Sequence, residues 1–329
     1  MIKKIKQRFR FWDNDYTFLI YVTRILGYVL TFSYLIITFF DKKKTRKFNI
    51  HKNYFVLKRR ELIKEYNEPA DEEFRKKFLK KDRYDFNGIF IPKIENTNLL
   101  RSVYSDTFKI YTEMNDNYHY SIVDEVDKII PEGSYCYIGP NNEDITIKPN
   151  YTVIDAGAWL GDFSSYAAKK GAHAYAFEPS PSNIKLLEKT IEYNEGWEGK
   201  ITIVPFGLGN KEEILEFYEN EESENTGGNS FRIPEGTGNI KLNIVTLDGW
   251  AEKNNINKID FIKADIEGYE RNMLLGATKT LQIHEPILSI CTYHNSDDSV
   301  VLKKIILDAN PKYNIIQRKM KLFAYVNKN

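Results

Sequence analysis

Residues 151–179 read YTVIDAGAWLGDFSSYAAKKGAHAYAFEP, and this stretch decides the fold. A short apolar run ends in Asp155, a glycine-bearing turn and a helical pattern follow, and a second apolar run closes on Glu178. Strand, tight turn, helix and strand in such quick succession are the outline of a βαβ unit. Gly157 and Gly161 allow the turn to run tight and let a ligand approach the backbone. The unit therefore predicts a ligand that lies across two strand ends.

The acid at the end of the second strand and the glycine spacing indicate which ligand this is. Glu178 can accept hydrogen bonds from both hydroxyls of a ribose, as the acid of dinucleotide sites does. The dinucleotide fingerprint needs a G-x-G-x-x-G array, but Asp155 and Leu160 stand where its first and third glycines belong. This spacing speaks against a dehydrogenase. The D-x-G-x-x-x-G loop is instead typical of class I S-adenosylmethionine (SAM) methyltransferases, and a plain strand-to-helix turn is the alternative.

Strands and helices alternate through the rest of the chain after residue 150. Residues 201–206, 259–263 and 287–292 read as apolar strands, and residues 313–326 read as two strands of a closing hairpin. This alternation predicts an α/β fold with a mainly parallel sheet. Ligands of such sheets lie at the carboxyl ends of the strands. Five candidate residues fall there: Asp155, Glu178, Gly207, Asp265 and His294.

An acidic group and a histidine follow the later strands. Asp265 and Glu267 come directly after residues 259–263, and His294 follows the next strand. A carboxylate or an imidazole within hydrogen-bond reach would help a hydroxyl lose its proton during methyl transfer. Helix capping is the alternative role for the two acids, and an ordinary loop position is the alternative for the histidine. Lys263 belongs to the buried strand, so we expect it to be paired rather than solvated.

Six segments together resemble the FkbM-type family of SAM-dependent methyltransferases. They are VIDAGAWLGDFS, AFEPSPSN, VPFGLGN, VTLDGWA, DFIKADIEGYE and LSICTYHN, in this order. The resemblance covers approximately residues 85–329. It implies a class I methyltransferase sheet with a terminal antiparallel strand, and O-methylation, often of sugar or natural-product hydroxyls.

The resemblance also implies roles for single residues on the cofactor side. Asp155, Gly157 and Gly161 would line the SAM loop, and Glu178 would hold the ribose. Trp159 departs from the pattern, because the family more often has Asn at this position, and we include it among the predicted cofactor contacts.

On the acceptor side, the same match implies that Asp265 and Glu267 border the reacting centre. With His294 they form the predicted catalytic set. No metal is assigned, although an Asp/Glu/His cluster has oxygen and imidazole ligands that suit several divalent ions.

The N-terminal part has a different character. Residues 16–40 are 25 residues long with one charge, Arg24. A helix of this length spans about 37 Å, enough to cross a hydrocarbon core of about 30 Å. A spanning helix, an interfacial helix and a buried core helix remain open, and membrane association is the prediction. Residues 1–47 are the predicted membrane-associating segment, 48–84 a helical connector, and 85–329 the methyltransferase-like domain, with a SAM-binding core at about 150–329.

The charge distribution supports a lipid rather than a nucleic-acid partner. Residues 1–60 carry fifteen Lys/Arg against three Asp, which gives this segment a net charge of +12. The whole chain has a net charge of +1, so the remaining residues carry −11. The positive charges flank the apolar stretch, as expected for anionic lipid headgroups. Cys136 and Cys291 form no C-x-x-C pair, which fits a reducing compartment.

These observations combine into one functional prediction with one rival. The prediction is a membrane-associated SAM-dependent O-methyltransferase that acts on a hydroxyl of a glycan, a lipid-linked saccharide or a related metabolite. Its catalytic domain would face the cytoplasm, where SAM is made. The rival is a non-catalytic nucleoside-binding or scaffold protein of a membrane glycan assembly.

Overall fold

The computed structural model describes residues 76, 78–86, 88–93, 135–139, 143–217, 240–318 and 320–327. The chain divides into two compact units, Met1–Phe74 and Arg75–Asn329, and the described residues all belong to the second. The predicted membrane-associating segment and most of the predicted connector lie outside the described residues. Within the described part of the chain, no helix is both long and apolar enough to cross a membrane.

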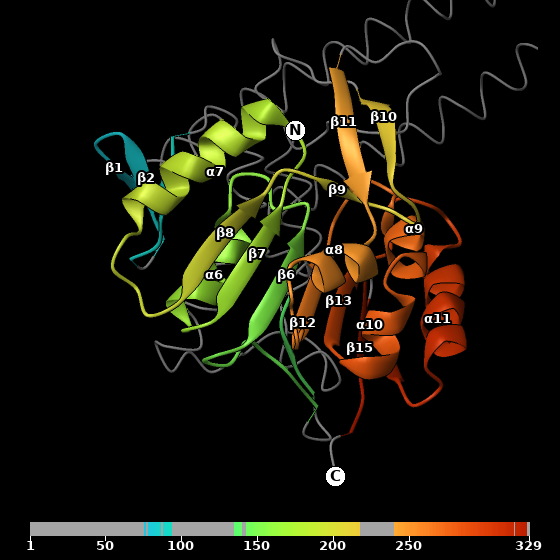
Figure 1. Cartoon of the computed structure of the whole chain (residues 1–329). Coiled ribbons are helices and arrows are strands. Elements are labelled where there is room, and N and C mark those ends of the chain that lie inside the picture. Colours follow the sequence, from blue (N-terminus) through green and yellow to red (C-terminus); the bar gives the residue numbers. More distant parts are fainter. Residues whose placement is uncertain are drawn as a thin grey trace, which may run out of the picture. The chain divides into compact units, whose positions relative to one another are not determined.

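A sheet of seven strands is the centre of this unit, in the order β14-β15-β13-β12-β6-β7-β8 (Figure 1). Strands β6, β7, β8, β12 and β13 run parallel, while β15 is antiparallel to both β13 and β14. This is the class I methyltransferase sheet with the C-terminal hairpin, so both predictions are confirmed. The strands are β6 (Thr152–Ala156), β7 (His173–Phe177), β8 (Lys200–Val204), β12 (Phe261–Ala264), β13 (Ile287–Cys291), β14 (Asn314–Arg318) and β15 (Lys321–Tyr325).

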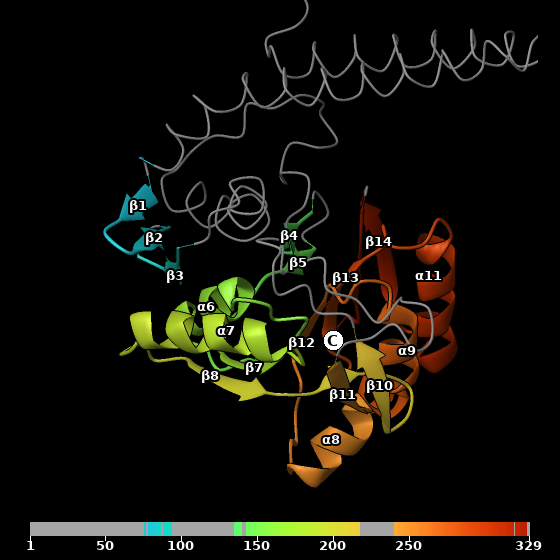
Figure 2. The same ribbon diagram turned by 90° about the horizontal axis from the view of Figure 1, so that it is seen from above.

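Helices cover both faces of the sheet. Helices α6 and α7 lie on one face, and α8 lies on the other when the unit is viewed from above (Figure 2). Parallel strands buried on both faces explain why β12 is apolar along nearly its whole length. The helices are α6 (Asp162–Lys169), α7 (Pro181–Tyr193), α8 (Leu247–Lys253), α9 (Glu270–Leu275), α10 (Thr278–Ile283) and α11 (Asp298–Ala309).

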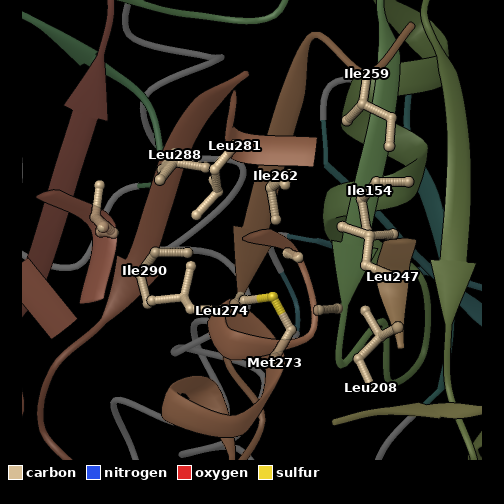
Figure 3. Close-up of a cluster of buried hydrophobic side chains, with 14 of the residues drawn as sticks. Ile154, Leu208, Leu247, Ile259, Ile262, Met273, Leu274, Leu281, Leu288 and Ile290 are labelled. Atoms are coloured by element: carbon tan, nitrogen blue, oxygen red, sulfur yellow. The ribbon is translucent and has the colours of Figure 1, made fainter. Parts of the chain in front are cut away.

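Aliphatic side chains fill the space between the sheet and helices α8 to α11 (Figure 3). Ile154, Ile262 and Leu288 come from three neighbouring strands, and Leu274 and Leu281 come from the helices; all five are fully buried. Burial of each such side chain contributes about 1.5–3 kcal/mol. This core fixes the three strand ends that carry the candidate site.

A serine cap starts α7. The hydroxyl of Ser180 accepts a hydrogen bond from the N–H of Asn183 at 3.3 Å, and Pro181 occupies the first helical position. The helix therefore begins directly after Glu178, which stays in the short segment between strand and helix.

Smaller strand pairs surround the sheet. Strands β4 (Tyr137–Ile138) and β5 (Asp144–Ile145) form one pair. Strands β10 (Glu213–Phe217), β11 (Ile240–Val245) and β9 (Gly207–Leu208) form a separate sheet. The predicted strand 201–206 ends earlier, at Val204, because the chain turns there to enter β9.

The prediction of a helical connector over residues 48–84 is wrong at its C-terminal end. Leu79–Lys80 is strand β1, paired with β2 (Arg83–Asp85), which in turn pairs with β3 (Phe90–Pro92). Asn194 at the end of α7 holds β3, because its side-chain oxygen accepts from the N–H of Phe90 at 2.8 Å. This contact spans over a hundred residues, and helical periodicity does not reveal it.

Candidate active site

The loop after β6 contains three residues in the left-handed backbone region. Gly157, Trp159 and Gly161 have φ angles of 75°, 48° and 86°. A Cβ atom at Gly157 would lie 2.1 Å from the backbone oxygen of Asp265. This distance is shorter than any real contact of a Cβ atom, so another residue would fit here only if the backbone moved. Glycine at this position therefore lets the loop after β6 contact the loop after β12. We call these two segments the donor loop (157–161) and the acid loop (265–270).

Glu178 connects the end of β7 to the donor loop. One carboxylate oxygen accepts the N–H of Trp159 at 2.8 Å, and the other accepts the N–H of Ser180 at 2.9 Å and the amide of Asn183 at 3.1 Å. Burial raises the pKa of Glu178 above its usual value, although these three hydrogen bonds lower it in part. A carboxylate offers about four acceptor positions, so room remains for one further donor.

Asp155 does not face open space, because it is fully buried in a pair with Lys263. The two residues are register partners on β6 and β12, with 3.0 Å between Lys263 Nζ and Asp155 Oδ1. The second carboxylate oxygen accepts the hydroxyl of Ser164 on α6 at 2.6 Å. Asp155 therefore acts on the site through Lys263 and α6.

Lys263 carries the effect of this pair into the donor loop. Its ammonium donates to the backbone oxygen of Gly157 at 2.7 Å. Burial lowers the pKa of Lys263, but the carboxylates of Asp155 and Asp265 outweigh burial and raise it above its usual value. Lys263 is thus a cation that pairs with Asp155 and holds the donor loop, as the expectation of a paired lysine requires.

Asp265 is held at the end of β12 by two tyrosines. Tyr135 donates to one carboxylate oxygen and Tyr293 to the other, each at 2.7 Å. Burial raises the pKa of Asp265, but Lys263 and the two hydroxyls outweigh it, so the net shift is downward. The side chain is 20% exposed, so an ionised carboxylate is accessible at this edge of the sheet.

His294 lies between three carboxylates. Its Nε2 atom is 3.6 Å from Asp265 Oδ1 and 3.5 Å from Glu267 Oε2, and its Nδ1 atom is 3.1 Å from Glu270 Oε1. Burial lowers the pKa of His294, but Glu270, Asp265 and Glu267 together raise it above its usual value. The three predicted catalytic residues are therefore brought together. We call Asp265, Glu267, Glu270 and His294 the acid–histidine cluster.

Glu270 is a member of this cluster that we did not predict. The sequence offered one indication of this role, because Glu270 is the final acid of the KADIEGYE segment. The carboxylate of Glu270 is fully buried and accepts the N–H of Ile266 at 2.8 Å. Glu267 and Gly268 in the same loop have φ angles of 54° and 94°. Glu270 therefore holds both the strained acid loop and the imidazole.

The other predicted cofactor residues have different positions. Gly207 lies in β9, three residues beyond the end of β8, where it pairs with Ile244 instead of ending the strand before it. Trp159 contacts Glu178 through its backbone N–H. No ligand tests the predicted roles of these residues.

Comparisons with known proteins agree with this geometry. The family model for the methyltransferase FkbM domain matches residues 155–312. Hexuronic acid methyltransferase AglP of Haloferax volcanii is 25% identical over 130 residues, covering 39% of this chain and 50% of AglP. The chain thus spans about half the length of this curated relative.

Two solved structures are similar to this chain at low identity. Methyltransferase FkbM from Methylobacillus flagellatus KT is 19% identical, with a TM-score of 0.43, covering 79% of this chain and 59% of that one. Magnesium protoporphyrin IX methyltransferase ChlM from Synechocystis PCC 6803, solved with bound SAM, is 14% identical, with a TM-score of 0.33, covering 54% of this chain and 71% of that one.

The strand order of the sheet is that of the class I methyltransferase fold. Residues 155–312 match the model of the methyltransferase FkbM domain, which confirms the resemblance found in the sequence.

The buried pair predicts a specific pattern of stability. Lys263→Met should lower the free energy of unfolding by about 3–5 kcal/mol, because it leaves the Asp155 carboxylate buried without a cation. Adding Asp155→Asn should recover much of that loss, since it removes the charge and keeps an acceptor for Ser164. Urea unfolding of both variants measures the two values.

Lys304→Met is the matched control for this measurement. Lys304 is exposed and pairs with Asp308 one helical turn away, so its loss should cost less than about 1 kcal/mol. Equal costs for the two lysine substitutions would contradict a structural role for the buried pair.

Proposed function

We propose that this protein is a SAM-dependent O-methyltransferase whose acceptor is a hydroxyl of a glycan, a lipid-linked saccharide or a related metabolite. One observation carries the proposal, namely the contact between the donor loop and the acid loop at Gly157, where a Cβ would lie 2.1 Å from Asp265. A donor held by the first loop and an acceptor held by the second would be neighbours. Methyl transfer is an in-line displacement, so alignment of two reactants is the main requirement.

Glu178, which holds the donor loop through Trp159, fits SAM. Glu178 keeps one acceptor position, so in this geometry it would take one ribose hydroxyl rather than the two expected from the sequence. A hydroxyl donor there would favour the ionised carboxylate, which burial disfavours in the free protein. Bound SAM would supply an electrophilic methyl group on a sulfonium.

The acid–histidine cluster would take the proton of the acceptor. As the acceptor oxygen gains the methyl group, its O–H bond breaks and the donor leaves as a neutral thioether. Asp265 is ionised and accessible, and the imidazole of His294 lies 3.6 Å from it, so both groups are available to receive that proton. Tyr135 and Tyr293 orient the carboxylate through their hydrogen bonds.

The choice of a saccharide hydroxyl rests on family likeness. The FkbM domain supports methyl transfer in general, and AglP is a methyltransferase of hexuronic acid. A carbohydrate acceptor also agrees with an enzyme that works next to a membrane, where lipid-linked saccharides are assembled.

SAM binding should depend on pH through Glu178. Because the pKa of Glu178 is raised, its carboxylate gains a proton, and loses acceptor strength, as the pH falls toward that raised value from above. Isothermal titration should therefore show full SAM affinity at neutral pH and a decline in acid. Glu178→Ala should weaken binding about tenfold to a hundredfold, because a hydrogen bond to a charged group contributes about 1.5–3 kcal/mol.

Glu188→Ala is the control for this titration, because Glu188 is an exposed acid on the same helix that follows Glu178. The assignment of Glu178 fails if both variants bind SAM as tightly as the natural protein. It also fails if the affinity of the natural protein is the same at every pH at which it stays folded.

Turnover should depend on Asp265 while SAM binding does not. Asp265→Ala should lower the rate of S-adenosylhomocysteine formation at least about a hundredfold, because it removes a proton acceptor and two positioning hydrogen bonds. The assay uses hexoses, hexuronic acids and lipid-linked saccharides as acceptors, with Asp308→Ala, an exposed acid on α11, as control.

Two results would sink this mechanism. Full turnover by Asp265→Ala removes the assigned role of the carboxylate. SAM that is bound but never consumed across the acceptor panel favours the non-catalytic scaffold protein instead.

The N-terminal residues extend the proposal to location. Residues 16–40 would associate with a membrane, and the methyltransferase domain would face the cytoplasm, the source of SAM. After cell lysis the full chain should remain with the membrane fraction in high salt, whereas a chain without residues 1–47 should appear in the supernatant. Release of the full chain by salt alone would argue against insertion.

A further inference from the structure

The acid–histidine cluster has the spacing of a cation site. Asp265, Glu270 and His294 each offer a ligand atom, and these atoms all lie within 4.8 Å of one another. The imidazole Nε2 is 3.6 Å from Asp265 Oδ1, which exceeds the usual N–H···O distance of about 2.7–3.2 Å. Neighbouring ligands of one first-row ion at about 2.1 Å are about 3.0 Å apart in octahedral and about 3.4 Å apart in tetrahedral geometry, so this separation is close to that of a cation site.

Glu270 supplies an independent observation. Its side chain is 1% exposed, and its Oε1 atom faces the imidazole at 3.1 Å and accepts the N–H groups of Ile266 and Gly268. Its Oε2 atom is buried and has no hydrogen-bond partner among the described residues. A buried acceptor left in this state costs about 1–3 kcal/mol, more when it is charged, so a native protein rarely keeps one without a use.

The charges of the acid–histidine cluster also favour a bound cation. Three carboxylates surround one imidazole, and within the described part of the chain His294 is the ion-pair partner of Glu270. Two lysines, Lys263 and Lys321, lower the pKa of Asp265 through their charges. Lys263 pairs with Asp155, and the Lys321 ammonium lies 3.7 Å from the centre of the Tyr135 ring. An excess of negative charge therefore remains at the inner end of the cluster.

We infer that Asp265, Glu270 and His294 bind a divalent cation. Carboxylate and imidazole ligands together suit first-row ions such as Mn²⁺. Side-chain exposure falls from 38% at Glu267 to 20% at Asp265 and 1% at Glu270, so an ion would enter past Glu267. On the basis of the proposed function, such an ion would polarise the acceptor hydroxyl, and Glu267, which is not one of its ligands, would receive the proton in place of Asp265 and His294.

Mn²⁺ binding to the full chain tests this inference without SAM or acceptor. Electron paramagnetic resonance should show that the signal of free Mn²⁺ falls as protein is added. The decrease should correspond to one binding site per chain. Electron spin-echo modulation of the bound ion should show coupling to an imidazole ¹⁴N. This second signal needs no variant, and its absence would overturn the inference even if Mn²⁺ binds elsewhere.

Variants locate the site. His294→Ala should abolish the ¹⁴N coupling, and Glu270→Gln should weaken Mn²⁺ binding at least about tenfold, as loss of a ligand or its partner does. His173→Ala and Glu188→Gln should leave binding unchanged, since His173 lies at the opposite, amino end of β7 and Glu188 is exposed on α7. Unchanged binding in both cluster variants would refute the site.

The result is separable from the proposed function. SAM titration of each variant reports whether the donor side is intact. A protein that binds SAM but no Mn²⁺ contradicts the cation site alone, whereas one that binds Mn²⁺ through His294 but no SAM contradicts the proposed methyltransferase activity alone.

Discussion

The buried pair between Asp155 and Lys263 is the interaction on which the site depends. It joins the two central strands, β6 and β12, at the edge where both strands end. Lys263 also donates to the backbone oxygen of Gly157, so one ammonium fixes the start of the donor loop. The acid loop begins two residues after Lys263. A change in this pair would therefore move donor and acceptor sides together, although neither member needs to contact a ligand.

Each of the two loops is held by a buried glutamate. Glu178 accepts the N–H of Trp159 in the donor loop, and Glu270 accepts the N–H of Ile266 in the acid loop. Both loops contain a residue other than glycine with positive φ, Trp159 at 48° and Glu267 at 54°. Backbone strain of this kind persists where the surroundings over-determine the conformation, and it gathers at functional sites. The two glutamates thus have corresponding roles on opposite sides of the proposed reaction.

The parts of the fold that could be predicted are those with short-range signals. Apolar runs and glycine turns predicted β6, α6 and β7, and the carboxyl-end rule brought Asp265 and His294 to one edge. Contacts between distant segments could not be predicted. Tyr135 lies 130 residues before the carboxylate that it orients, and β1 replaces a predicted helix because β2 pairs with it. Glu270 could be recognised as an acid of the KADIEGYE segment. Periodicity does not reveal that its carboxylate accepts a hydrogen bond from Ile266 in the acid loop.

Trp159 shows how a departure from the family pattern is accommodated. Asn tolerates the left-handed region well, whereas a bulky side chain there costs about 1–2 kcal/mol. The hydrogen bond from its N–H to the Glu178 carboxylate, at 2.8 Å, contributes a similar amount, about 1.5–3 kcal/mol. Both partners of this bond belong to the chain, so the bond itself fixes the conformation of the donor loop. A ribose hydroxyl would then occupy the remaining acceptor position of Glu178 without displacing Trp159, so little binding energy would be spent on ordering the loop.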